Sequence, residues 1–415
     1  MYKVLLLVQI FFIWFGLTGT VEAAKQEHQH HHAATVHSEC DKQDALPSLR
    51  CANAPSAVFD DNGRLWVAWE FGNHVYVNYS DDKGKSYSLP VAVNTVPEQI
   101  YAMGENRPKI VIGNRGRIYV SWTQKLEQRF SGHIRFSYSA DNGKHFFDPV
   151  TVNDHKVVTS HRFDAMAVNE RGDIYIAWLD KRDLLKAKKE GKAYNGAALY
   201  YAVSTDGGKS FSKNKKVIDY SCQCCRVVMA IDNDQLPVIV WRHIFGDNIR
   251  DHALVKFDNQ TQAGKVQRVS YDNWQVDACP HHGPDISISK NGSYHLAWFN
   301  NAPQRHGLFY ARTDDQGKSF SEPLSFGNYN AQAAHPQVLS KGDNIFLAWK
   351  EFDGKQSILF MMRSSDAGKS WSTPHIIAKT AGGSDHPLLI ADNKNVYSVW
   401  HRLGQDYQLF PLEGY

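Results

Sequence analysis

The chain has 415 residues, and its 46 Lys and Arg against 43 Asp and Glu give a formal net charge of +3. This nearly neutral balance does not suggest a polyanion partner, so we expect no nucleic-acid partner. The length exceeds the size at which a single hydrophobic core usually splits, so we expect either several domains or one large closed architecture.

Residues 1–23 have the pattern of a secretory signal peptide. Lys3 supplies a short charged region, an apolar run follows from Val4 to about Gly16, and Val21-Glu22-Ala23 resembles a cleavage site. An uncleaved membrane anchor is the alternative, but the apolar run is short for a membrane span of roughly 20 residues. No later stretch of the sequence is apolar enough to cross a bilayer. We therefore expect an exported protein, periplasmic or secreted, without a transmembrane segment after cleavage.

Residues 24–39 are rich in histidine, and we expect them to form a flexible tail. The stretch HQHHHAATVH is of a kind that collects metal ions, with histidines at His28, His30, His31, His32 and His37. Six cysteines follow, and an even number in an oxidising compartment favours pairing. We expect Cys40 to pair with Cys51 and to pin the N-terminal segment to a single domain formed by residues 40–415.

A repeated unit fills this domain: an apolar run, a turn rich in Asp, Asn or Gly, and an apolar strand ending in Trp. It occurs seven times, ending at Trp69, Trp122, Trp178, Trp241, Trp298, Trp349 and Trp400. Alternating apolar residues on both sides of a tight turn predict a β-hairpin. Seven hairpins at this spacing predict an all-β fold, a β-propeller with four-stranded antiparallel blades. Seven blades are favoured, and six blades with a partial unit are the alternative.

A second repeat, S/T-x-D-x-G-x-x-aromatic, falls between these units, as in SDDKGKSY from Ser80 and STDGGKSF from Ser204. It resembles the Asp box, or BNR repeat, of the sialidase superfamily. In such a turn the carboxylate accepts backbone N–H bonds and Gly supplies a positive φ. We therefore assign a structural role, not a catalytic one, to its five aspartates, Asp82, Asp141, Asp206, Asp315 and Asp366.

Two units depart from the pattern. The fourth has a plain hairpin in place of the box after Trp241, and the seventh ends after YQLFPL, about one strand short. Because a propeller must close to bury its sheet edges, we expect the segment near Cys40 to Cys51 to supply the missing strand.

The resemblance also places polar residues around the propeller axis. In a sialidase-like propeller the innermost strands begin on one face, and the loops after each Trp strand open on the same face, which is the default binding site. The alternative is a wet channel mouth that tolerates any polar residue. We expect a ligand-binding face formed by Arg107, Arg162, Asp180, Arg182, Arg226, Arg242, Arg250, His335 and His386.

The catalytic part of the sialidase pattern is poorly matched. Sialidases hold the substrate carboxylate with three arginines, the first in an Arg-Ile-Pro motif, and use a Tyr activated by Glu together with an Asp. The corresponding place here reads Asn53-Ala54-Pro55, and an Arg-Pro pair, Arg107-Pro108, comes one blade later. No Tyr and Glu pair stands out by position, so we assign no catalytic residues.

The stretch SCQCCRVV places Cys222, Cys224 and Cys225 before the fourth innermost strand, and ACPHHGP places Cys279 before the fifth. These segments, with Arg250-Asp251 between them, resemble a group of exported bacterial sialidase-like proteins. The resemblance implies that the cysteines form a set, and it implies no settled reaction.

Three interpretations of this set remain open. Two disulfides are possible, although short loops strain disulfide geometry. A catalytic thiol is possible, but no Cys and His pair identifies a nucleophile. Thiolate and imidazole ligands suit copper or zinc, and the metal-ligand candidates are Cys222, Cys224, Cys225, Cys279, His281 and His282.

We expect an exported sialidase-like propeller that binds a transition metal, copper or zinc, at its axial face, and we expect no nucleotide cofactor. Its role would be metal capture or delivery, or a metal-dependent reaction. The alternatives are an exo-sialidase-type glycoside hydrolase or a lectin for a small acidic sugar, and a scaffold for an unassigned protein partner.

Overall fold

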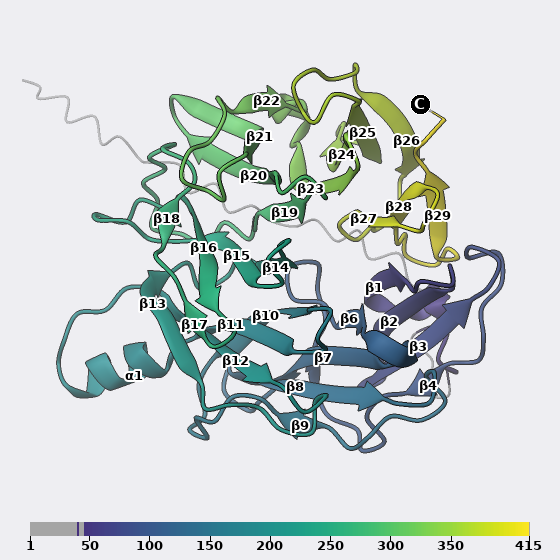
Figure 1. Ribbon diagram of the computed structural model, residues 1–415, viewed down its shortest axis with the longest axis horizontal. Coiled ribbons are helices and arrows are strands. Elements are labelled where there is room, and N and C mark those ends of the chain that lie inside the picture. Colours follow the sequence, from purple (N-terminus) through teal and green to yellow (C-terminus); the bar gives the residue numbers. More distant parts are fainter. Residues whose placement is uncertain (1–39, 41–44, 415) are drawn as a thin grey trace, which may run out of the picture. The chain divides into compact units, whose positions relative to one another are not determined.

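The computed structural model describes Cys40 and residues 45–414, and the expected signal peptide and His-rich tail lie outside these residues. The described chain forms seven antiparallel sheets, arranged as a ring in Figure 1, where the colour runs from purple β1 round to yellow β29. The innermost strands contact one another in the order β1, β6, β10, β14, β19, β23 and β27, and β27 contacts β1. The prediction of a seven-bladed propeller is confirmed.

The first three blades follow the expected strand order. Blade one contains β1 (Asn53–Phe59), β2 (Leu65–Phe71), β3 (His74–Ser80) and β4 (Val91–Ala92). Blade two contains β5 (Ile100–Tyr101), β6 (Lys109–Ile112), β7 (Ile118–Lys125), β8 (Gly132–Ser139) and β9 (Val150–Thr151), with β5 and β6 both paired to β7. Blade three contains β10 (His161–Val168), β11 (Ile174–Asp180), β12 (Ala197–Ser204) and β13 (Lys215–Ser221).

The remaining blades contain the variations that the sequence indicated. Blade four contains β14 (Val228–Ile231), β15 (Pro237–Arg242), β16 (His252–Asn259), β17 (Gln262–Ala263) and β18 (Gln267–Arg268), the last two both paired to β16. Blade five contains β19 (Asp285–Ile288), β20 (Tyr294–Ala302), β21 (Arg305–Thr313) and β22 (Leu324–Phe326). Blade six contains β23 (Ala334–Lys341), β24 (Asn344–Phe352), β25 (Ser357–Ser364) and β26 (His375–Thr380). Blade seven contains β27 (Leu388–Ala391), β28 (Val396–Trp400) and β29 (Gln408–Pro411).

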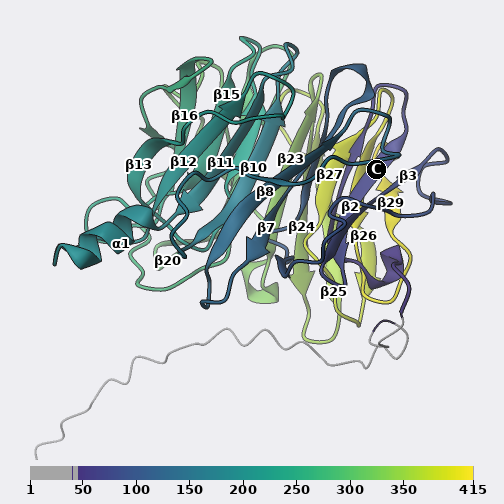
Figure 2. The ribbon, with the colours of Figure 1, turned by 90° about the horizontal axis from the view of Figure 1, so that it is seen from below.

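Helices are few and short in the described chain. The α-helix α1 (Arg182–Lys189) follows β11, and both Figure 1 and Figure 2 show it at the periphery of the ring. Three 3-10 turns are η1 (Leu49–Cys51), η2 (Asn114–Gly116) and η3 (Tyr329–Ala331). Among the described residues, no helix is both long and apolar enough to span a membrane.

The core lies between adjacent blades and is organised by the repeated Trp residues. All seven of them lie on the second long strand of a blade, or at its end, and are at most 1% exposed. Burial of such large apolar surfaces, each worth several kcal/mol when truncated, accounts for the repeat seen in the sequence.

The five S/T-x-D-x-G turns each join the third and fourth strands of a blade. In the first, Ser80 donates to Asp82 Oδ1 at 2.8 Å, and the backbone N–H of Ser86 donates to the same oxygen at 2.8 Å. Gly84 has φ of +82°, a conformation that favours glycine. The aspartates are thus occupied by the hydrogen bonds of their own turns.

Ring closure differs from the expectation. The Cys40–Cys51 disulfide is confirmed, but the described residues 45–52 form η1 and not a strand, so the predicted fourth strand of blade seven is wrong for this segment. Blades one and seven instead meet through side chains. Leu49 packs in one apolar cluster with Tyr397, and Lys83 donates to the Tyr397 hydroxyl at 2.8 Å.

Candidate functional site

Three buried cysteines lie together in the turn between β13 and β14. Cys222, Cys224 and Cys225 are at most 5% exposed and are not disulfide-bonded. The Cys222 sulfur lies 3.7 Å from the Cys224 sulfur and 3.7 Å from the Cys225 sulfur. The turn begins at Cys222, whose backbone N–H donates to the Arg242 carbonyl at 2.9 Å and so fixes the turn against blade four. We call these three residues the thiol triad.

Positive groups surround the thiol triad. Arg250 Nη1 donates to the Cys222 sulfur at 3.3 Å. Arg162 is 6% exposed, its Nε is buried with no hydrogen-bond partner among the described residues, and its guanidinium lies over the Tyr101 ring. Burial lowers the pKa of Arg162, and Tyr101 and Cys224 oppose that effect. A buried cation without an acidic partner favours negative charge at the neighbouring sulfurs.

The thiols share protons unequally. Hydrogen bonds from Cys224 and Cys225, together with Arg250, hold the pKa of Cys222 well below its usual range. The pKa of Cys224 is raised because its thiol hydrogen-bonds to Cys222, and burial raises the pKa of Cys225. Outside the triad, a hydrogen bond from Cys224 lowers the pKa of Cys279 to about 7.

A second donor set shares Cys224 with the triad. The donor atoms of Cys224, Cys279 and His281 all lie within 4.8 Å of one another, and Cys279 is exposed. Cys279 and His281 come from the loop between β18 and β19. His282, the sixth predicted metal ligand, belongs to neither set among the described residues, because its ring stacks on Phe299 and His335 at centroid distances of 4.1 and 4.7 Å.

A separate polar cluster lies at the axis, where four innermost strands begin. Glu105, in the tight turn Met103–Asn106 before β6, is 2% exposed. Its Oε1 lies 3.4 Å from His335 Nδ1 and 3.6 Å from His386 Nδ1. Arg226, which precedes β14, donates to Oε1 and Oε2 at 3.0 Å each. We call Glu105, His335 and His386 the axial triad.

The axial triad has a defined charge state. Burial lowers the pKa of His335 to about 4 and also lowers that of His386, so both imidazoles are neutral near pH 7 and keep a lone pair. Burial opposes ionisation of Glu105, but Arg226 and His335 outweigh it and hold the pKa of Glu105 well below its usual range. Burial lowers the pKa of Lys350, a cation close to both histidines, and Asp385 opposes that effect.

His335 owes its position to a backbone irregularity. It has φ of +55° and lies in a bulge of β23 between Ala334 and Gln337. The same irregularity occurs near the start of β1 and of β10. Bulges of this kind re-aim side chains near sheet edges, and here the bulge turns His335 toward Glu105.

Several of the predicted arginines are engaged by protein groups, whereas Arg162 Nε has no hydrogen-bond partner among the described residues. Arg107 forms an ion pair with Asp385 at 3.1 Å, and Arg242 donates to the carbonyls of Arg250 and Phe299 at 2.7 Å each. Asp180 and Arg182, also predicted for the ligand face, pair with each other at 2.8 Å. The predicted face therefore offers no set of unengaged guanidiniums among these residues for a substrate carboxylate.

Sequence reasoning missed Glu105. The signal that pointed to Arg107, its place just before an innermost strand, extends to Glu105 two residues earlier, but the turn that brings the carboxylate back to the axis has no sequence signature of its own.

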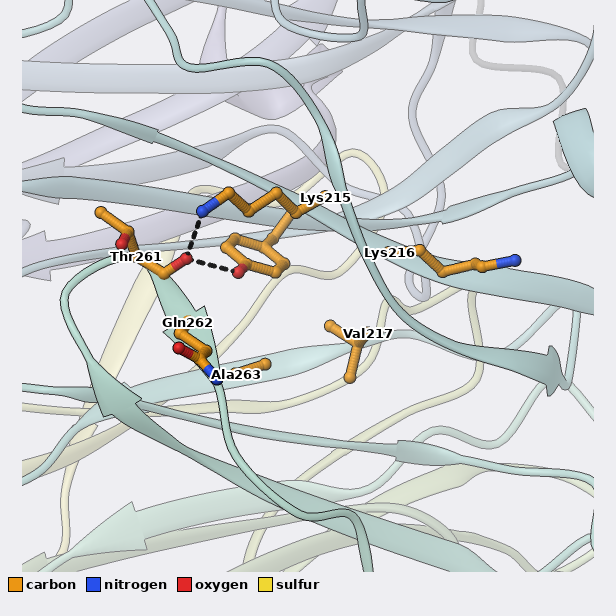
Figure 3. Close-up of a pocket in the computed structure, with 7 residues that line it drawn as sticks. Lys215, Lys216, Val217, Thr261, Gln262 and Ala263 are labelled. Atoms are coloured by element: carbon orange, nitrogen blue, oxygen red, sulfur yellow. Dashed lines mark hydrogen bonds between the residues drawn. The ribbon is translucent and has the colours of Figure 1, made fainter.

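A groove of about 450 Å³ lies away from both triads, between blades three and four (Figure 3). It is lined by Tyr201, Lys215, Lys216, Val217, Thr261, Gln262 and Ala263. Lys215 and the Tyr201 hydroxyl both donate to the Thr261 carbonyl, at 2.7 and 2.8 Å. Lys216 pairs instead with Asp183 and Asp219 outside the lining, and the lining residues include no carboxylate.

Comparisons with known proteins identify the architecture and nothing narrower. No protein-family model matches the chain, and no curated protein matches its sequence. A Hadza microbial sialidase, Hz136, is 14% identical, with 84% of this chain and 76% of that chain covered and a TM-score of 0.51. A polysaccharide lyase of family PL25, an ulvan lyase, is 10% identical, with 87% and 93% covered and a TM-score of 0.55. The polysaccharide lyase Uly1 is 10% identical, with 87% and 88% covered and a TM-score of 0.51.

At these identities the likeness shows the fold alone. The chain is a seven-bladed propeller, and its fold is similar to those of a sialidase and two polysaccharide lyases.

Proposed function

We propose that the protein binds a soft transition-metal ion, Cu⁺ or Zn²⁺, through the thiol triad. The observation that carries this proposal is the spacing of the three sulfurs. Two thiolates bound tetrahedrally at about 2.3 Å from one ion lie about 3.8 Å apart. The Cys222 sulfur lies 3.7 Å from each of the other two sulfurs, and all three lie within 4.8 Å of one another. A disulfide would bring two sulfurs to about 2.05 Å.

The surrounding charge supports an anionic centre. Three thiolates around Zn²⁺ carry a formal charge of minus one, and around Cu⁺ a charge of minus two. Arg250 touches the Cys222 sulfur, and the buried Arg162 has an Nε without a hydrogen-bond partner among the described residues. Buried charge is tolerated where it is paired, so these cations fit a loaded triad.

The second donor set gives the ion a route from solvent. Cys279 is exposed and Cys224 is buried, and both belong to a set whose donors lie within 4.8 Å. An ion captured by Cys279 and His281 needs to change few ligands to reach Cys222 and Cys225, because Cys224 belongs to both sets. The role that follows is metal capture or delivery.

Metal analysis of the exported full chain tests this proposal. The protein is purified without an added His tag and with the tail histidines replaced (His28→Ala, His30→Ala, His31→Ala, His32→Ala, His37→Ala), because that tail is itself a metal-binding candidate. We expect one tightly held Cu⁺ or Zn²⁺ per chain, lost in Cys224→Ser. His306→Ala, on an exposed ring outside both donor sets, is the control. Failure of the reduced protein to bind either ion would refute the proposal.

A second candidate function is binding or cleavage of an acidic sugar, supported by the fold shared with the sialidase and the lyases. Turnover of a fluorogenic sialoside that is lost in Arg107→Ala would support it. We rank it second because Arg107 is engaged by Asp385.

A further inference from the structure

The axial triad combines three donors from three blades. Glu105 comes from the turn before β6, His335 from β23 and His386 from the loop before β27. The Nδ1 atoms of both histidines are buried and have no hydrogen-bond partner among the described residues, and His335 is 8% exposed. Buried nitrogens of this kind normally have a partner, so two unsatisfied nitrogens directed at one carboxylate oxygen require an explanation.

The separations fit a shared ion better than hydrogen bonds. Glu105 Oε1 lies 3.4 Å from His335 Nδ1 and 3.6 Å from His386 Nδ1. Hydrogen bonds between such groups are about 2.7 to 3.2 Å long. Donors bound tetrahedrally at about 2.0 to 2.2 Å from one ion lie about 3.3 to 3.6 Å apart. The three donor atoms all lie within 4.8 Å of one another.

The carboxylate is held in place by outer hydrogen bonds, as metal-binding carboxylates usually are. Glu105 Oε2 accepts from the backbone N–H of Arg226 at 3.0 Å and from that of Gly283 at 2.8 Å. Arg226 is in turn fixed by the carbonyls of Pro284 and Pro336, each at 2.9 Å. Oε1 accepts one bond from Arg226 and keeps a second acceptor position.

Two glycines make room for this arrangement. A Cβ at Gly104 would lie 2.4 Å from His386 Nδ1, and one at Gly283 would lie 2.2 Å from Arg226 Cγ. Either side chain would push a ligand or its support out of place. The close packing extends to the rings, since His335 and His386 stack with centroids 3.3 Å apart.

We propose that Glu105, His335 and His386 hold a divalent transition-metal ion, Zn²⁺ or Cu²⁺, at a second site on the propeller axis. Imidazole and carboxylate donors suit these borderline ions, whereas thiolates select softer ones. Three protein donors leave a fourth position for water or an exogenous ligand. The site shares no residue with the thiol triad, so it stands or falls separately from the proposed function.

Titration with Co²⁺ distinguishes the two sites, because cobalt bound to thiolate absorbs strongly in the near ultraviolet and cobalt bound to nitrogen and oxygen does not. The full chain with the five tail histidines replaced is used, and we expect two ions per chain. His335→Ala and Glu105→Gln should each remove one equivalent and leave the thiolate band intact. Cys224→Ser should remove the band and leave one equivalent. His306→Ala, on an exposed ring, is the control and should change neither.

The outcomes separate the two proposals. If the parent chain binds only one Co²⁺ and shows the thiolate band, the axial site is refuted. If it binds only one Co²⁺ and lacks that band, the thiol site is refuted. If His335→Ala and Glu105→Gln do not fold, as seen by loss of the native circular dichroism, anomalous diffraction from zinc-soaked crystals of the parent chain decides the question. We expect a peak about 2.0 to 2.2 Å from both Nδ1 atoms, and its absence at full thiol-site occupancy overturns the inference.

Discussion

Replacement of Arg250 by Met should weaken binding of Cu⁺ far more than binding of Zn²⁺. Arg250 Nη1 lies 3.3 Å from the Cys222 sulfur and is 3% exposed. Both ions share the same metal-free protein, so the ratio of their affinities depends on the loaded forms alone. The Cu⁺ form carries one more negative charge than the Zn²⁺ form, and the Arg250 cation stabilises that extra charge.

The size of the effect follows from the geometry. The extra charge is centred on the metal. The metal–sulfur bond of about 2.3 Å and the contact between Arg250 and the sulfur meet at an angle, which places the metal about 5 Å from the guanidinium. At an effective dielectric constant of about 20, unit charges at this distance interact by about 3 kcal/mol. The Cu⁺ affinity should therefore fall about 100-fold relative to the Zn²⁺ affinity.

Competition against chromophoric chelators measures both affinities, with Cu⁺ handled anaerobically under reductant. Arg250→Met also leaves the Val276 carbonyl without its donor at 2.8 Å, which should lower stability by about 1 to 3 kcal/mol. This loss cancels in the ratio because both ions bind the same folded variant. Arg363→Met, which removes an arginine paired with neutral Asn344 in blade six, is the control. An unchanged Cu⁺ to Zn²⁺ ratio in Arg250→Met would contradict the electrostatic reasoning.

Three further predictions concern loading, acid stability and ring closure. Cys279→Ser should slow metal uptake in stopped-flow measurements while changing the equilibrium affinity less than about threefold, because the three buried thiols remain. A loss of metal affinity equal to that of Cys224→Ser would contradict the loading route. Hydrogen bonds from Ser210 oppose burial and lower the pKa of Asp206 to about 2 from a usual 3.8, so the stabilisation that the Asp206 carboxylate provides is present at neutral pH and is lost as the pH falls from about 4 to 2. Asp206→Asn should flatten the dependence of the unfolding free energy on pH in this range, as measured by urea titrations. An unchanged slope would count against a stabilising role of the turn. Leu49→Ala, at a site 8% exposed between blades one and seven, should destabilise the protein by about 2 to 3 kcal/mol. The control Leu46→Ala, at a site 82% exposed, should change stability by less than about 0.5 kcal/mol. Equal effects of the two substitutions would show that Leu49 does not contribute to closure of the ring.

The fold was predictable because its signals are local and repeated. Each Trp strand must bury a large side chain between two sheets, so the same pattern returns with every blade, as Trp69 and Trp241 illustrate at 0% exposure. Ring closure was not predictable in the same way. Leu49 and Tyr397 belong to one apolar cluster although they lie far apart in the sequence, and a grouping of this kind leaves no periodic trace.

The two candidate sites also differ in whether their residues lie close together in the sequence. Cys222, Cys224 and Cys225 are adjacent in sequence, so their grouping was visible there. The axial triad is assembled from residues 105, 335 and 386, which the ring brings together at 3.4 to 3.6 Å. His335 and His386 were predicted for this face, whereas Glu105 was missed because it reaches the axis through a turn. His335 reaches the axis through a left-handed backbone conformation within a strand. Neither conformation follows from residue type.

The pairing of the buried arginines bears on the second candidate function, recognition of an acidic sugar. A propeller that clamps a substrate carboxylate needs guanidiniums free to bind it bidentately. Here Arg107 is paired with Asp385, and Arg226 with Glu105, all largely buried. Freeing either arginine would leave a buried carboxylate unpaired, at a cost of about 3 to 5 kcal/mol before any substrate contact is made. Arg226 instead donates to Glu105 and Arg250 to Cys222, so both guanidiniums orient donor groups of the two metal sites that we propose.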